Sequence, residues 1–160
     1  MLEAEPSHWY SRNYVILQNG QRLAEIKRGL FREQGSITVG GQTCRIRRDG
    51  LTGPFLYEVD GTVLARAWIH SFRRFFDVEY EGQRYKLRAR SRALLARTFV
   101  LERDGEVIGT IRPKSLFGRK LLIEMSSLPP TIALFLFWLV MIQLQREEAA
   151  AAGGAVAASG

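Results

Sequence analysis

The sequence predicts an all-β protein: a closed antiparallel barrel of about twelve strands, built from consecutive hairpins around one central C-terminal hydrophobic helix. Three observations lead to this fold class. A hairpin pattern repeats five times, the strands of the repeat alternate apolar and polar residues, and one uniformly apolar segment follows them. The 160 residues are enough for a single domain with a sizeable core.

Five glycine-containing turns mark the repeat, and each separates two short β-prone runs. The glycines recur about every 20 residues, a spacing typical of a structural repeat. Asn-Gly, Gly-Gly and Asp-Gly favour two-residue hairpin turns because both central residues then need a positive φ. The turns are Asn19-Gly20, Gly40-Gly41, Asp60-Gly61, Glu81-Gly82 and Asp104-Gly105. Five hairpins give ten strands, and residues 115–125 offer a further pair around Gly118-Arg119.

Alternation along the strands indicates which side chains face the core. In the fourth unit, Phe76, Val78 and Tyr80 fall on the opposite side from Asp77 and Glu79. The return strand sets an apolar face against a basic one, Tyr85, Leu87 and Ala89 against Arg84, Lys86, Arg88 and Arg90. A period of two residues indicates half-buried antiparallel strands.

The most apolar segment runs from Leu128 to Leu144, and every residue from Ile132 to Ile142 is apolar. Pro129 and Pro130 suit the entry and first turn of a helix. Eleven apolar residues rise roughly 16 Å, about half of a ~30 Å hydrocarbon core. We therefore expect a buried helix over about residues 130–145 that fills the barrel, since twelve strands enclose more space than their own side chains occupy. The alternative is a tail-anchored single-pass membrane protein with residues 128–144 in the bilayer.

The expected organisation is a polar lead-in over residues 1–8, a barrel with its helix over residues 9–145, and an Ala/Gly-rich disordered tail over residues 146–160. Glu3, Glu5 and Pro6 do not resemble a secretory leader, which favours a cytoplasmic location. A single cysteine, Cys44, excludes an intramolecular disulfide and a thiolate zinc cluster, and its position in the alternation predicts an inert core residue.

The search for catalytic residues predicts a protein that is not an enzyme and needs no cofactor or metal. His8 and His70 are the only histidines, and neither has Cys, Asp or Glu at metal-ligand spacing. Motifs for a phosphate-binding loop, a dinucleotide fold or a nucleophile elbow are absent.

The informative polar feature is basic. Lys plus Arg number 23 against 16 Asp plus Glu, for a net charge of +7. A basic strip forms on one strand face, with its last member in the connection beyond: Arg84, Lys86, Arg88, Arg90 and Arg92. Arg45 and Arg47 make a smaller group of the same kind. Such cations form either a solvated outer face or a binding surface for anionic lipid headgroups or nucleic acid.

The hairpin series followed by a hydrophobic helix resembles the tubby carboxyl-terminal-like superfamily, which includes tubby proteins, LURP-one-related proteins and phospholipid scramblases. The segment from Asp104 to Ile111, Asp-Gly-Glu-Val-Ile-Gly-Thr-Ile, is similar to a run that LURP-one-related and scramblase-like members carry before their last strands. The resemblance covers about residues 9–145 and implies a barrel around a central helix. The phosphoinositide-pocket signature of tubby proteins and the acidic calcium segment and cysteine cluster of scramblases are absent from the sequence, so those activities are not implied.

Together these observations predict a non-catalytic, tubby-like module that binds an anionic membrane surface or phospholipid headgroups through the basic strip. Such a protein would be cytoplasmic and peripheral at the membrane. The alternatives that stay open are the tail-anchored protein and a nucleic-acid-binding or regulatory module.

Overall fold

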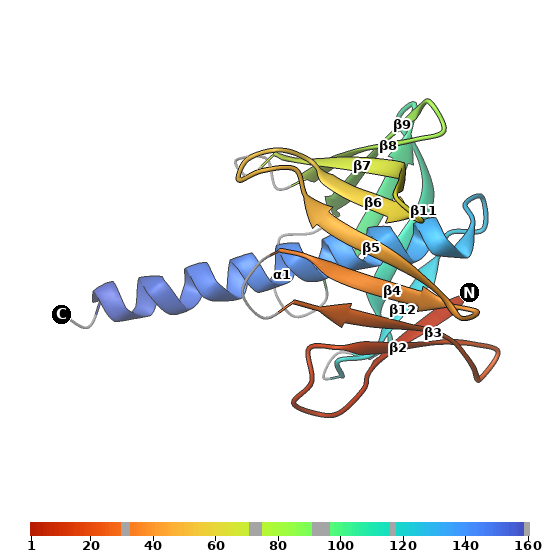
Figure 1. Ribbon diagram of the computed structural model, residues 1–160. Coiled ribbons are helices and arrows are strands. Elements are labelled where there is room, and N and C mark those ends of the chain that lie inside the picture. The colour runs from red at the N-terminus through yellow and green to blue at the C-terminus, as the bar shows by residue number, and fades with distance from the viewer. Residues whose placement is uncertain (30–32, 71–74, 91–96, 116–117, 159–160) are drawn as a thin grey trace.

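The computed structural model describes residues 1–29, 33–70, 75–90, 97–115 and 118–158, with side chains to residue 153. Twelve strands precede one long helix (Figure 1). The strands are β1 (Leu2–Pro6), β2 (Tyr14–Gln18), β3 (Gln21–Arg28), β4 (Gly35–Val39), β5 (Gln42–Arg48), β6 (Phe55–Val59), β7 (Thr62–His70), β8 (Phe75–Tyr80), β9 (Gln83–Ala89), β10 (Phe99–Arg103), β11 (Glu106–Pro113) and β12 (Leu121–Glu124), and the helix is α1 (Pro130–Ala158).

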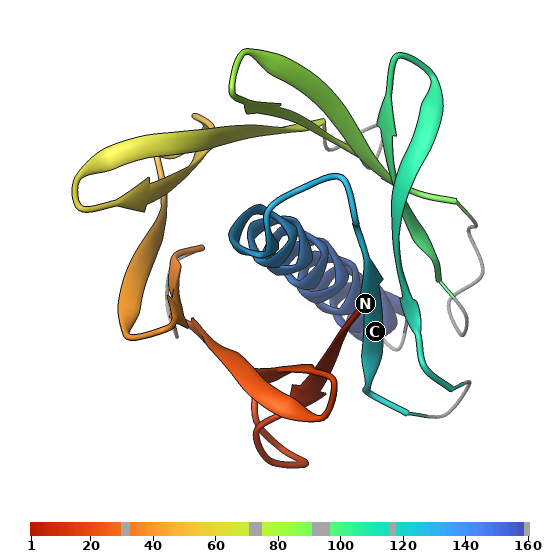
Figure 2. The same ribbon diagram turned by 90° about the vertical axis from the view of Figure 1, so that its right-hand side faces the viewer.

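The strands form one closed barrel in which each strand pairs antiparallel with its neighbours in the sequence. The ring closes between β12 and β1, where Leu2 pairs with Ile123. Figure 2 looks along the barrel and shows the strands surrounding α1. The predicted all-β barrel around a central C-terminal helix is therefore confirmed.

Five two-residue turns lie together at one end of the barrel, which we call the turn end (Figure 1). The first residue of all five turns has a positive φ, for example 49° at Asp60 and 53° at Asp104. The glycine that follows has a larger positive φ, 79° at Gly61 and 85° at Gly105. These angles are those of the type I′ turns that the sequence predicts.

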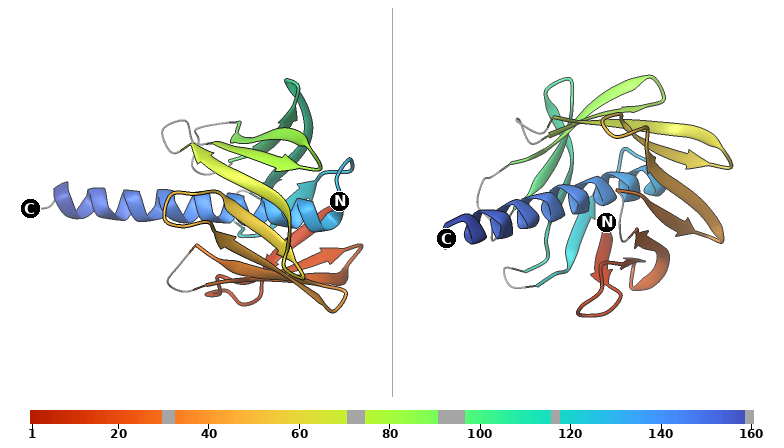
Figure 3. Two further views of the ribbon diagram at one scale, coloured as in Figure 1. Left: turned by 45° about the horizontal axis from the view of Figure 1, so that its top comes forward. Right: turned by 60° about the vertical axis from the view of Figure 1, so that its left-hand side comes forward.

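The other end of the barrel, the loop end, is where the longer connections join the strands. The strand ends there are Pro6, Arg28, Arg48, His70, Ala89 and Pro113. α1 enters the barrel at the turn end and leaves it at the loop end, beyond which it projects (Figure 3). Residues 149–158 account for about 15 Å of that helix at 1.5 Å per residue.

The barrel wall contacts α1 on all sides, which explains why the helix has no polar face. Trp138 packs edge-on against Phe55 of β6 with ring centroids 5.4 Å apart, and Phe135 stacks on Tyr57 at 5.1 Å. On the other side of the helix, Phe137 meets Tyr14 of β2 at 5.3 Å. All side chains from 132 to 142 are buried, as predicted for a helix that fills the barrel. No helix within the described residues is both long enough and apolar enough to cross a bilayer.

The predicted polar lead-in over residues 1–8 is wrong, because residues 2–6 form β1, the strand that closes the barrel. Leu2 and Ala4 are buried and alternate with the two glutamates, so the period of two was present in the sequence. The strand is short and a seven-residue connection separates it from β2, so no turn signal marked it. The predicted strand pair around Gly118-Arg119 is also wrong, since these residues precede the single strand β12.

The predicted disordered tail is wrong over residues 146–158, which continue α1. The physical reason is the intrinsic helix propensity of alanine, the highest of all residues, acting on a helix that the barrel has already nucleated. Residues 159–160 lie outside the described part of the chain.

Candidate anion-binding surfaces

The predicted basic strip lies on the outer face of the barrel. Arg84 and Lys86 of β9 are exposed, Arg88 is half-buried, and Arg90 follows the end of the strand. Tyr85 between them is 7% exposed, so the predicted alternation of this strand is confirmed. Arg92 lies outside the described residues.

Acidic residues on the neighbouring strands face the basic strip. Arg88 donates from Nη2 to Oε1 of Glu102 on β10 at 2.5 Å. This hydrogen bond raises the pKa of Arg88 and lowers the pKa of Glu102. On the other side, β8 places Glu79 opposite Arg84 and Asp77 opposite Lys86.

Lys86 also makes a local contact, because its Nζ lies 4.9 Å from the centroid of the Phe75 ring. Glu102 pairs with Arg88, whereas Glu79 and Asp77, which lie opposite Arg84 and Lys86, make their closest polar contacts with Arg66 and His70. The strip thus combines one cross-strand ion pair, which contributes modestly to stability, with the exposed cations Arg84 and Lys86, which form no ion pair with a described residue.

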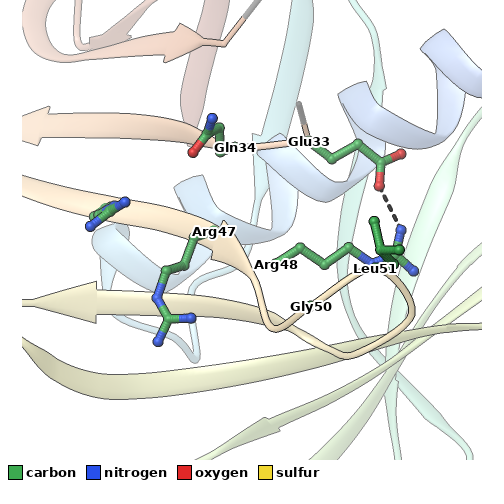
Figure 4. A pocket seen from close by; sticks show the side chains of 7 residues that line it. Glu33, Gln34, Arg47, Arg48, Gly50 and Leu51 are labelled. Atoms are coloured by element: carbon green, nitrogen blue, oxygen red, sulfur yellow. Dashed lines mark hydrogen bonds and ion pairs between the residues drawn. The ribbon is translucent and has the colours of Figure 1, made fainter. Parts of the chain in front are cut away.

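The smaller basic group of β5 lines a pocket instead (Figure 4). This β5 pocket is an open cavity of about 590 Å³ on the outer side of β4 and β5, near the loop end. Its lining residues are Glu33, Gln34, Arg45, Arg47, Arg48, Gly50 and Leu51. A cavity lined by three arginines and a side-chain amide offers several hydrogen-bond donors to an oxyanion.

Two of the three guanidinium groups in the β5 pocket are held in place. Arg47 pairs with Glu58 of β6 at 2.7 Å. Arg48 pairs with Glu33 at 2.8 Å and lies 5.2 Å from the centroid of the Phe55 ring. Arg45 is exposed and makes no ion pair with any described residue. The pocket thus combines two oriented arginines with one whose charge is not compensated locally.

Glu33 connects the pocket to the helix, because it also accepts a hydrogen bond from Nε of Arg146 on α1 at 2.5 Å. Burial raises the pKa of Glu33, but the hydrogen bonds and charges of Arg146 and Arg48 outweigh it. The pKa therefore lies below its ordinary value. The carboxylate fixes α1 to the wall at the point where the helix leaves the barrel.

Exposed apolar side chains accompany the cations of the loop end. Trp9 is 85% exposed and Tyr10 is 69% exposed in the connection between β1 and β2, and Leu51 is 92% exposed in the connection between β5 and β6. Cations at this end include Arg12, Arg28, Lys114, Arg119 and Lys120, of which Lys114 pairs with Glu3 and Lys120 pairs with Glu5. The turns at the other end contain Asp60, Glu81 and Asp104 and no lysine or arginine.

The other candidates for chemistry lie apart from these surfaces. His70 lies on the outer face, where its Nε2 is 2.7 Å from Oδ2 of Asp77 and its ring stacks on Phe75. Cys44 is 1% exposed, which confirms the predicted core position. Within the described ranges, no three His, Cys, Asp or Glu side chains come together as a possible metal site.

Comparisons with protein-family models, with curated proteins and with solved structures find no match to this chain. The geometry of the surfaces therefore carries the functional argument.

Proposed function

We propose that the protein is a non-catalytic binding module of the tubby-like kind whose partner is an anionic phospholipid surface. The observation that carries this proposal is the composition of the loop end. Arg12, Arg28 and Arg119, which form no ion pair within the described residues, lie there beside Trp9, Tyr10 and Leu51, whereas the turns of the other end contain Asp60, Glu81 and Asp104 and no lysine or arginine. The proposed surface is the loop end with the adjoining β5 pocket, in place of the basic strip on β9.

The physical basis is that two kinds of side chain act together at a membrane. Each cation close to an anionic leaflet contributes about 1 kcal/mol of attraction, which fades with distance over the Debye length. Tryptophan and tyrosine favour the headgroup level because one part of the ring system is apolar and another is polar. The charge asymmetry between the two ends would orient the barrel with the loop end toward the membrane.

The tubby-like assignment rests on architecture. The resemblance implies a closed barrel around one hydrophobic helix, and the chain has twelve strands around α1. We propose, on this basis, a cytoplasmic protein that is peripheral at the membrane.

The experiment is co-sedimentation with vesicles of phosphatidylcholine alone and with vesicles containing phosphatidylserine. The protein should bind only the anionic vesicles, and binding should fade between 0.1 M and 1 M salt as the Debye length falls from about 10 Å to about 3 Å. Equal binding to both vesicles, or none to either, contradicts the proposal. A stronger preference for single-stranded oligonucleotides at equal phosphate would support the nucleic-acid alternative instead.

A matched pair of variants separates the two basic surfaces. Arg45→Gln with Arg47→Gln removes two charges from the β5 pocket, and Arg84→Gln with Lys86→Gln removes two from β9. The first pair should weaken binding about tenfold or more, given the contribution expected of each cation at the surface. The second pair should change binding much less. Equal losses would mean that only net charge matters.

A further inference from the structure

A second cavity lies where α1 leaves the barrel. This mouth pocket, of about 200 Å³, is bounded by β2, the end of β3, the segment before β12 and the helix. Its polar lining residues are Tyr14, Arg28, Arg119, Gln145 and Glu148. A water molecule occupies about 30 Å³ of liquid, so the pocket has room for one phosphate group and a few waters.

Two arginines of the mouth pocket are bound to neutral oxygen atoms. Arg28 donates from Nε to the carbonyl of Arg12 at 3.0 Å, and from Nη1 to the Met141 carbonyl and to Gln145 Oε1, each at 3.3 Å. Arg119 donates to the carbonyls of Trp9 at 2.5 Å and Ser11 at 2.9 Å. These bonds fix the positions of the guanidinium groups without neutralising them.

Three positive charges therefore come together without a paired carboxylate. None of Arg12, Arg28 and Arg119 forms an ion pair with a carboxylate of the described chain. Burial lowers the pKa of Arg28, and the charges of Arg12 and Arg119 lower it further, whereas Tyr14 and Glu148 act in the opposite direction. A bound anion would offset the mutual repulsion of these cations, and a partly buried guanidinium binds an oxyanion more strongly than an exposed one does.

An aromatic pair stands beside the pocket. The rings of Trp9 and Tyr10 meet edge to face with centroids 5.6 Å apart, and most of both side chains is exposed. Arg119 donates a hydrogen bond to the Trp9 carbonyl, so its guanidinium group lies next to the backbone of the aromatic pair. Residues 149–158 of α1, which project from the same end, contain no charged residue that a lipid surface would repel.

We propose that the mouth pocket binds the phosphate of one anionic phospholipid molecule, and that Trp9 and Tyr10 enter the headgroup region beside it. This inference rests on the proposed function and adds a specific lipid site to it. Arg28 and Arg119 line the pocket and supply positive charge, to which the nearby Arg12 adds. Glu148 on the rim competes with the phosphate for these arginines.

Tryptophan fluorescence tests where the membrane lies, because the three tryptophans of the chain are in different places. Trp9 is 85% exposed at the loop end, Trp68 is 38% exposed on the outer face of β7, and Trp138 is fully buried. In the Trp68→Phe protein, vesicles of brominated phosphatidylserine should quench the Trp9 emission. In the Trp9→Phe protein, the same vesicles should leave the emission unchanged.

Substitutions at the rim test the phosphate site itself. Glu148→Gln should tighten binding to phosphatidylserine vesicles several-fold, because it removes the competing carboxylate. The matched control is Glu106→Gln at the turn end, which raises the net charge equally and should have little effect. Arg12→Gln with Arg119→Gln should weaken binding more than Arg84→Gln with Lys86→Gln does. A circular-dichroism melt of each variant shows whether the fold is retained.

Two soluble probes distinguish binding of a phospholipid from binding of free phosphate. Dihexanoyl phosphatidylserine below its micelle concentration should shift the Trp9 emission of the Trp68→Phe protein, and inorganic phosphate at equal concentration should not. An equal response to both would overturn the lipid assignment. Vesicle binding without quenching of Trp9 would overturn the mouth site and leave the proposed function intact. Absence of vesicle binding would overturn the proposed function and this inference together.

Discussion

The two ends of the barrel differ in how strictly the backbone constrains their residues. At the turn end, each connection has two residues with positive φ, as at Asp60-Gly61 and Asp104-Gly105, so glycine, asparagine and aspartate are favoured there. At the loop end the connections are longer and carry Trp9, Tyr10 and Leu51 on the surface. The turn end therefore determines the fold, and the loop end has the freedom to present side chains to a partner.

The largest expected effect concerns α1, on which both ends depend. Leu139→Asp places a charge where the side chain is completely buried, which should cost about 4 kcal/mol or more and unfold the domain. Leu136→Asp should destabilise the domain to a similar extent. Thermal denaturation measures the effect. A soluble variant with an unchanged melting temperature would show that the barrel does not need the helix in its interior.

The next-largest effect is expected at the turn end, where a substitution should lower stability without changing vesicle binding. Gly61→Val puts a β-branched residue at a φ of 79°, which should lower the free energy of unfolding by about 1–3 kcal/mol. Thr62→Val, in the adjacent strand, is the control and should change stability little. Vesicle binding by the folded fraction should be the same for both. Chemical denaturation and co-sedimentation check this, and loss of binding would mean that the turn end also contacts the membrane.

A smaller effect is expected at the loop end. Glu33→Gln removes the carboxylate shared by Arg48 and Arg146 and should destabilise the protein by about 1–2 kcal/mol at neutral pH. The pKa of Glu33 is lower in the folded protein than its unfolded value of about 4.3. Its contribution is therefore present above that pH and is lost as the pH falls through the folded pKa. The stability difference between parent and variant should shrink in acid, and a difference independent of pH would contradict this role.

The smallest effect is expected on β9. Arg84→Gln with Lys86→Gln alters two exposed side chains that face carboxylates, so the free energy of unfolding should change by about 0.5 kcal/mol or less. Vesicle binding should fall only slightly. Denaturant titration and co-sedimentation test both statements. If this variant loses membrane binding completely, the strip on β9 rather than the loop end is the binding surface.

The sequence was sufficient to predict the hairpins and the core because both depend on local rules. Turn dipeptides require a particular φ, and alternation assigns each side chain to a face, so Phe76 and Cys44 could be placed inside. β1 was missed because its only signal is the alternation of Leu2 and Ala4 with two glutamates. Its place in the sheet depends on β12, more than a hundred residues away along the chain.

The functional surfaces were harder to predict because they depend on cross-strand neighbours. The run of arginines on β9 gave no sign that β10, in the next hairpin, would place Glu102 beside Arg88. Glu33, Arg48 and Arg146 likewise meet only once the helix has passed through the barrel. One sequence feature could have indicated a binding surface at the loop end. Several connections place arginine close to aromatic residues, as in Trp9-Tyr10-Ser11-Arg12.

Closure of the barrel by β1 has a consequence for how the chain reaches its native state. Leu2 can pair with Ile123 only after β12 exists, so during synthesis the first strand waits for nearly the whole sheet with one edge unpaired. The apolar inner faces of the early hairpins stay exposed to solvent for longer still, until α1 is synthesised and covers them. Contacts so distant along the sequence make folding slow, and unpaired edges expose intermediates to aggregation. This protein should therefore refold with low yield at high concentration. Aggregation should compete with folding mainly during the interval before the first and last strands pair.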